Sequence, residues 1–173
     1  MLECLKSWVK PYKAAREIAR RHWEVYGGFL ALVRSPYLHF AVILSSCIWP
    51  FWNTKEQGTW HSLTLSVIPN MLGFTLAGYA IMLAFGNESF QKAISGDSAK
   101  GPSPFIQVNA AFAHFIMMQI MAVIYAVIGK GLNIYSGPLA WSGFTIFVYS
   151  VFTGLAAVLE LFRLSYWFNK FNE

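Results

Sequence analysis

Charged residues are scarce in this chain of 173 residues. They make up 12% of the sequence, while hydrophobic residues make up 56%. A soluble domain has about 25% charged and roughly 45 to 50% apolar residues, so lipid is the expected solvent for most of the chain. Each helical crossing of a bilayer takes roughly 20 residues. The length therefore allows a few crossings and leaves no room for a separate soluble catalytic domain.

Cysteine is also scarce, with only Cys4 and Cys47. The two lie far apart in the sequence, and the orientation derived below places them near opposite faces of the membrane. A structural disulfide is therefore not expected. The sequence contains no CxxC or HExxH motif and no Gly-rich phosphate loop, and its four histidines lie in four different segments. We expect no catalytic residue, metal or cofactor, and so no enzyme.

Long apolar runs are abundant, and they predict an all-α membrane protein. Residues 34–173 should form a domain of four transmembrane helices. Pro36 would open the first of them, because proline is tolerated in a first helical turn, and Pro69 predicts a kink in the second. The expected spans are about 37–52, 62–85, 105–128 and 139–162.

Residues 1–33 predict a basic amphipathic helix that lies in the membrane interface. Between positions 8 and 26, aromatic and small residues recur at steps of three and four, which places them on one face of a helix. Cations on the other face are typical of a helix attracted by anionic lipid headgroups. A soluble helix packed on a partner protein is the alternative, and nucleic acid is not an expected partner. The predicted contacts to lipid or to a partner come from Lys10, Lys13, Arg16, Arg20, Arg21 and Arg34.

The distribution of cations predicts the orientation of the chain. All of the 13 Lys and Arg residues except Lys55 and Lys130 fall on one side of the predicted spans. The positive-inside rule assigns that side to the cytoplasm. Both termini are then cytoplasmic, which requires an even number of spans and agrees with four.

The predicted second span carries a face of small and weakly polar residues. Small residues let helix backbones approach closely, so this face is expected to pack against another helix. The alternative is that it lines a pore after oligomerisation. Gln107 and His114 of the third span are seven residues apart and so lie on one helix face. They too could either pack against another helix or line a pore, and His114 could also sense protons. The candidate pore or packing residues are Ser62, Ser66, Pro69, Asn70, Gly73, Ala77, Gln107 and His114.

Three further pairs of residues have a spacing that suggests a role. Glu160 and Arg163 predict a structural ion pair at i,i+3, and Ser150 with Gly154 predicts another contact face of small residues. Arg34 and His39 form the Arg-x4-His string of RNA-cutting HEPN domains. That string contains a proline and lies where the first span enters the membrane. We therefore interpret Arg34 as a contact to lipid phosphate.

The run IPNMLGFTLAGYAI at residues 68–81 resembles a stretch of small bacterial inner-membrane proteins, some of which accompany anti-phage systems. A four-span subunit with cytoplasmic ends is also similar to the membrane component of the Kiwa anti-phage system. The resemblance implies a bacterial inner membrane, a homo-oligomer and a cytoplasmic partner protein. We therefore expect a non-enzymatic membrane sensor or anchor. The alternative is an oligomeric channel or membrane-depolarising effector.

Overall fold

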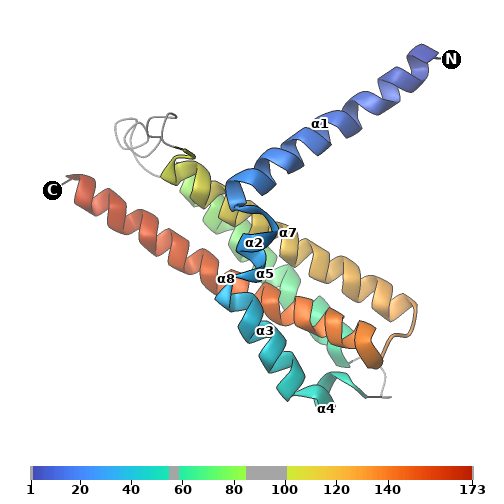
Figure 1. Ribbon diagram of the computed structural model, residues 1–173. Helices are drawn as coiled ribbons and strands as arrows, with labels where there is room; N and C mark the ends of the chain where they lie inside the picture. Colours follow the sequence, from blue (N-terminus) through green and yellow to red (C-terminus); the bar gives the residue numbers. More distant parts are fainter. Residues whose placement is uncertain (1, 55–58, 85–100, 173) are drawn as a thin grey trace.

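The computed structural model describes residues 2–54, 59–84 and 101–172, with the side chains of 11–54, 60–84 and 101–170. This part of the chain consists of helices, turns and short connections, which confirms the predicted all-α class (Figure 1). The helices are α1 (Leu2–Tyr26), α2 (Gly28–Val33), α3 (Pro36–Cys47), α4 (Trp49–Trp52), α5 (Thr59–Ala84), α7 (Pro104–Gly131) and α8 (Gly137–Asn172).

Three of these helices are long and apolar enough to cross a membrane. The candidate spans are Trp60–Ala84 in α5, Pro104–Gly131 in α7 and Gly137–Lys170 in α8, with mean hydropathies of 1.6, 2.0 and 1.8. At about 1.5 Å per residue, each is longer than the roughly 30 Å of a hydrocarbon core. The predicted second, third and fourth spans fall on these helices. The chain is therefore a multi-pass membrane protein.

The predicted first span, at 37–52, is not one continuous helix. α3 has 12 residues, which at 1.5 Å each is about 18 Å, so α3 alone does not cross the hydrocarbon core. It ends because Ile48 leaves the helical conformation, at φ −101° and ψ 34°. Pro50 in the next turn has no N–H to continue the hydrogen-bond ladder. The described part of the chain thus has three full-length apolar helices and one short one.

Proline has different effects at different positions. Pro36 and Pro104 occupy the first turns of α3 and α7, where no intrahelical partner for an N–H exists. Ahead of α7, the Ser103 hydroxyl accepts a hydrogen bond from the N–H of Ile106 at 3.3 Å and caps the helix. Pro69 lies inside α5, and the helix continues through it to Ala84.

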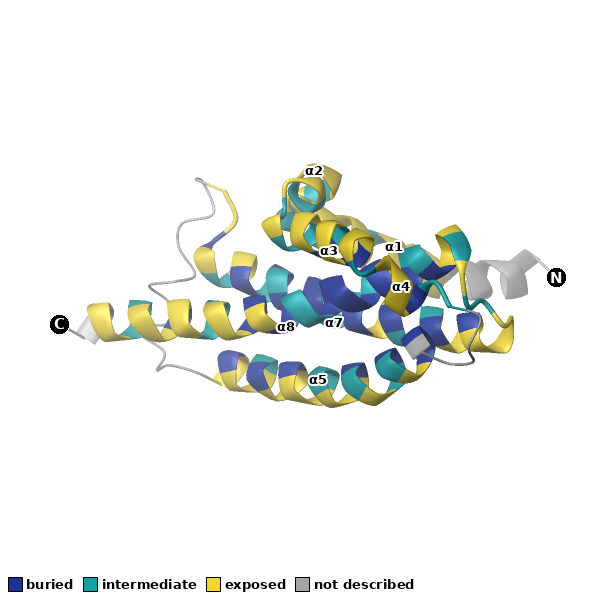
Figure 2. Cartoon of the chain, turned by 90° about the horizontal axis from the view of Figure 1, so that it is seen from below, coloured by how far each residue is buried: buried dark blue, intermediate teal, exposed yellow. Residues whose placement is uncertain are grey.

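α5, α7 and α8 pack side by side, and α3 packs along part of α8 (Figure 1). Figure 2 shows that the buried positions of these helices face one another, while the outer surfaces are exposed and carry many apolar side chains. A membrane bundle has this distribution because lipid is as apolar as the core. α1 contacts α7 and extends away from the bundle toward its own N-terminus (Figure 1).

Trp60, the largest fully buried side chain, lies between two glycines. A Cβ atom at Gly129 of α7 would lie 2.8 Å from the Trp60 ring, and one at Gly143 of α8 would lie 2.5 Å from it. The indole N–H donates a hydrogen bond to the carbonyl oxygen of Ile134, between α7 and α8, at 3.0 Å. Trp60 therefore joins α5 to both other long helices and to their connection.

The small residues predicted to form contacts on α8 lie inside the bundle. Ser150 is buried and donates a hydrogen bond to the carbonyl oxygen of Met118 on α7, at 3.0 Å. Gly154 faces Met71 of α5 so closely that a Cβ atom there would overlap the methionine methyl group. These two positions therefore serve helix packing within one chain.

Candidate functional site

One face of α5 is exposed, and it carries the residues predicted to be functional. A Cβ atom built on Gly73 meets nothing within 4 Å. Ser150 and Gly154 at other helix contacts are buried against neighbours, whereas the small residues of this face are exposed. The α5 outer face, as we call it below, consists of six exposed residues: Ser62, Ser66, Pro69, Asn70, Gly73 and Ala77.

Polar groups on the α5 outer face bond to the backbone of their own helix. Ser66 Oγ donates to the carbonyl oxygen of Leu63 at 3.0 Å, and Asn70 Nδ2 donates to that of Ser66 at 2.9 Å. The Asn70 Oδ1 atom accepts no hydrogen bond from the described residues. An amide oxygen against lipid costs free energy, which a donor on a neighbouring helix would offset. Lipid alone would therefore leave the Asn70 oxygen on this face without a hydrogen-bond donor.

The two predicted residues of α7 have surroundings of their own. Gln107 is exposed in the first turns of α7, where its Nε2 donates to the carbonyl oxygen of Pro102 at 2.8 Å. His114 is only 2% exposed and lies between α7, α8 and α1. The eight predicted residues therefore divide between an exposed helix face, a helix end and an internal junction.

Four aromatic and imidazole side chains meet where α1 joins the bundle. The Tyr26 ring stacks on the His114 ring with their centroids 4.1 Å apart, and the His22 ring stacks on Tyr26 at 6.1 Å. The His114 Nε2 and the Tyr149 hydroxyl on α8 share a hydrogen bond of 2.9 Å. We call these four residues the junction cluster. It connects α1, α7 and α8, and it gives a buried imidazole a polar partner.

The junction cluster offers imidazoles and phenols but no carboxylate or thiol. Within the described residues, no set of three or more His, Cys, Asp or Glu side chains is arranged to hold a metal ion. The contacts of the cluster fix the end of α1 on α7. The sequence indicated Tyr26 on the aromatic face of its helix and His114 in a span, but no spacing rule pairs residues so distant in the chain.

The amide side chains of α7 join it to α5. The Asn109 Oδ1 accepts a hydrogen bond from the Tyr79 hydroxyl at 2.5 Å, and Gln119 Nε2 donates to Thr75 Oγ1 at 3.0 Å. Hydrogen bonds between helices in lipid contribute on average about 0.6 kcal/mol. These two amides therefore serve contacts between α5 and α7.

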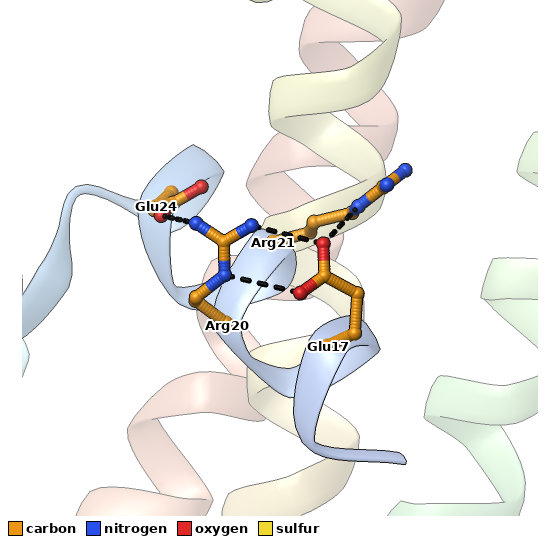
Figure 3. A network of polar contacts seen from close by, with 4 residues as sticks. All are labelled: Glu17, Arg20, Arg21 and Glu24. Carbon is orange, nitrogen blue, oxygen red and sulfur yellow. Dashed lines mark hydrogen bonds and ion pairs between the residues drawn. The ribbon is translucent and has the colours of Figure 1, made fainter. Parts of the chain in front are cut away.

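The polar face of α1 carries a closed network of ion pairs (Figure 3). Arg20 lies 2.9 Å from Glu17 and 2.7 Å from Glu24, and Arg21 lies 3.0 Å from Glu17. Hydrogen bonds from Arg20 and Arg21 hold the pKa of Glu17 well below its ordinary value, at about 2. Two cations and two anions cancel, so the network adds no net charge to α1.

Ion pairing divides the predicted contact cations into two groups. Arg20 and Arg21 are committed to the glutamates of α1. Lys13, Arg16 and Arg34 are exposed and have no ion pair among the described residues. The side chain of Lys10 lies outside the described residues. The second group therefore supplies the cations that are free to meet an anionic partner.

Glu160 and Arg163 form an ion pair near the end of α8, with Arg163 Nη1 3.4 Å from Glu160 Oε2. The guanidinium carbon of Arg163 also lies 4.4 Å from the centroid of the Trp167 ring, which is a cation–π contact. Tryptophan and arginine are common where a helix leaves the bilayer. The composition of this segment is therefore typical of the end of a membrane-spanning helix.

Acidification is expected to loosen the contact between α1 and α7. Burial lowers the pKa of His22 from its ordinary value of 6.5, so docked α1 favours the neutral imidazole. Docking is then strongest above pH 6.5 and weakens as the pH falls below it, because undocked α1 takes up the proton first. Amide hydrogen exchange in α1, corrected for its intrinsic pH dependence, should rise below that pH. Persistence of the full effect in His22→Gln would contradict this assignment.

Comparisons with protein-family models, curated proteins and solved structures gave no match for the chain. The fold itself therefore defines the class: a helical multi-pass membrane protein with three full-length apolar helices in the described residues. Within this class, the α5 outer face and the exposed cations Lys13 and Arg16 of α1 are two surfaces that other molecules could contact.

Proposed function

We propose that this protein is a non-enzymatic, homo-oligomeric subunit of a bacterial inner membrane that acts as a sensor or anchor for a cytoplasmic partner protein. The α5 outer face carries the proposal. Its small residues leave the helix backbone open to a neighbour, and Asn70 presents an amide oxygen that accepts no hydrogen bond from the described residues. A second copy of the chain would supply both a close helix contact and polar partners.

In the proposed topology, the segment from α2 to α4 makes a fourth crossing and both termini are cytoplasmic. The 12 residues of α3 supply about 18 Å of the path. Exposed apolar side chains on α2, such as Phe29 and Leu30, suit lipid contact at the near end. Trp49 of α4 is exposed as well, and tryptophan is common at the membrane–water boundary. Four crossings place both termini on the same side of the membrane, as the distribution of Lys and Arg residues requires.

α1 lies along the cytoplasmic membrane interface in this topology. It meets α7 at His114, about 15 Å along the helix from Pro104 at 1.5 Å per residue. Interfacial helices bury their apolar face about 5 to 10 Å into the boundary of headgroups and acyl chains. Lys13 and Arg16 would then face anionic headgroups or a cytoplasmic protein. The resemblance of residues 68–81 supports a role of this kind in anti-phage defence.

Gly73→Leu is expected to dissociate the oligomer. Apart from its own helix, no described residue lies within 4 Å of the new Cβ, so the substitution should leave the fold intact while blocking a close approach of a second copy. Mass photometry in mild detergent should show multiples of the wild-type chain and a shift of Gly73→Leu toward the monomer. Gly131→Leu is the matched control, because its Cβ is equally unobstructed. A monomeric wild type, or an unchanged mass for Gly73→Leu, would contradict the proposal.

A channel is the second candidate function, and one observation favours it. Asn70 follows Pro69 on the exposed face, where proline removes a backbone donor and leaves a carbonyl oxygen free for water. An assembled ring would place these groups around its axis. Induced cells should then lose membrane potential, and Asn70→Leu should restore it while retaining the oligomer mass. An unchanged potential on induction would exclude the channel and leave the anchor proposal intact.

A further inference from the structure

A groove of about 770 Å³ lies between α1 and α7, beside the junction cluster. This volume falls within the roughly 300 to 1,000 Å³ of typical ligand sites. On one wall the small side chains of Ala15 and Ala19 leave space, and on the other lie Met117 and Met118. Apart from two histidines, every lining residue is Ala, Ile, Leu, Met or Trp. The groove therefore suits a hydrocarbon chain.

One of the two histidines that line the groove has a ring nitrogen without a partner among the described residues. The Nε2 of His22 is buried and makes no hydrogen bond with the described residues, whereas that of His114 bonds to Tyr149. A buried polar atom without a partner destabilises the folded state. An occupant that is largely apolar but carries an oxygen atom at this point would remove that cost.

An unpaired cation borders the α1 wall of the groove. Arg16 is three residues before Ala19 and seven before Trp23, both of which line the groove, so helical spacing places it on the same side of α1. It is exposed and has no ion pair among the described residues. Arg20, by contrast, is shared between two glutamates. The polar end of an occupant would therefore meet a positive charge.

We propose that the groove binds one acyl chain of an anionic phospholipid from the cytoplasmic leaflet, with the ester carbonyl on His22 Nε2 and the phosphate on Arg16. The acyl chain fits the apolar lining, and the ester oxygen satisfies His22. His22 follows Arg16 by six positions, which is about 9 Å along the helix axis, a span that an arginine side chain and a glycerol phosphate bridge together. The inference rests on the proposed position of α1 at the membrane interface. The lipid then forms part of the joint between α1 and α7.

Photocrosslinking of the full chain tests this site. The probe is phosphatidylglycerol with a diazirine in its acyl chain, diluted into phosphatidylcholine nanodiscs, and labelled peptides are identified by mass spectrometry. We expect label on Met117, Met118 or Trp23. Arg16→Gln should reduce that label about fivefold, the equivalent of about 1 kcal/mol for a cation near an anionic surface. Arg20→Gln is the matched control and should label as the wild type does.

A second variant and a second readout separate this site from the α5 interface. Ala19→Phe fills the groove and should abolish the label on α7 while leaving the oligomer mass unchanged. A monomeric wild type that still labels in the groove would contradict the oligomer and support the lipid site. Equal labelling by Arg16→Gln, equal labelling by a diazirine phosphatidylcholine, or protein crosslinks in place of lipid would each overturn the proposal.

Discussion

Gly143→Ala is expected to destabilise the folded chain by about 1 to 3 kcal/mol, the usual cost of forcing a methylene-sized group into a filled core. The added Cβ would lie 2.5 Å from the Trp60 ring and 2.8 Å from the Tyr125 ring. The indole has little freedom to move, because it is 1% exposed and its N–H is bonded to Ile134. Thermal unfolding in detergent, followed by tryptophan fluorescence, should show a lower midpoint.

Two companion variants make this result specific. Gly131→Ala is the matched control because a Cβ there meets nothing within 4 Å, so its midpoint should equal or slightly exceed that of the wild type. Trp60→Phe shortens the ring, and in combination with Gly143→Ala it should cost less than the sum of the two single changes. Additive losses, or an unchanged midpoint for Gly143→Ala, would contradict the packing described for Trp60.

Tyr26→Ala is expected to release α1 from the bundle. The change removes the ring that stacks on His114 at 4.1 Å. Aromatic contacts contribute about 0.5 to 1.5 kcal/mol beyond burial, and lost burial adds a similar amount. Docking should therefore weaken by about 2 kcal/mol, which is roughly 30-fold. Hydrogen exchange of the α1 amides in nanodiscs should accelerate by that factor.

Tyr12→Ala on the same helix is the control for this prediction. Tyr12 is 70% exposed and does not belong to the junction cluster, so exchange in α1 should stay at the wild-type rate. Equal acceleration by both variants would show that loss of any tyrosine frays α1. An unchanged rate in Tyr26→Ala would assign docking to other contacts.

The three long helices could be predicted because their signal is local. Hydropathy sums consecutive side chains and needs no knowledge of neighbours, so α5, α7 and α8 follow from composition alone. The helix α8 continues beyond the predicted span of 139–162 and ends at Asn172. Its last turns mix Arg163 and Lys170 with aromatic residues, which continues a helix but not an apolar run.

The break after α3 depends on packing that hydropathy does not register. Residues 37–52 are apolar enough for one span, and Pro50 alone does not decide where a helix ends. In the structure, the indole N–H of Trp52 donates to the carbonyl oxygen of Ser45 at 2.6 Å. That bond joins the two sides of the break. Hydropathy does not register a hydrogen bond of this kind, so the sequence indicated a longer span.

The sequence predicted the spacing of small residues at the candidate site, but not which of these residues are exposed. Gly73 and Ala77 on α5, and Ser150 and Gly154 on α8, have the same spacing of small residues. The structure buries the α8 pair and exposes the α5 pair. Spacing does not distinguish a contact within one chain from a contact between chains. His114 shows the same limit, because its partners come from two other helices.

The bundle also contains apolar helices of very different length. α3 with 12 residues is about 18 Å long, whereas α7 with 28 residues is about 42 Å long. Where a bilayer contacts both helices, either the bilayer must thin locally or the helices must tilt. Each costs a fraction of a kcal/mol per Å of mismatch. Stretching a membrane thins it, and thinning lowers the mismatch beside α3 first. Lateral tension is therefore expected to act unequally on the lipid beside α3 and the lipid beside α7.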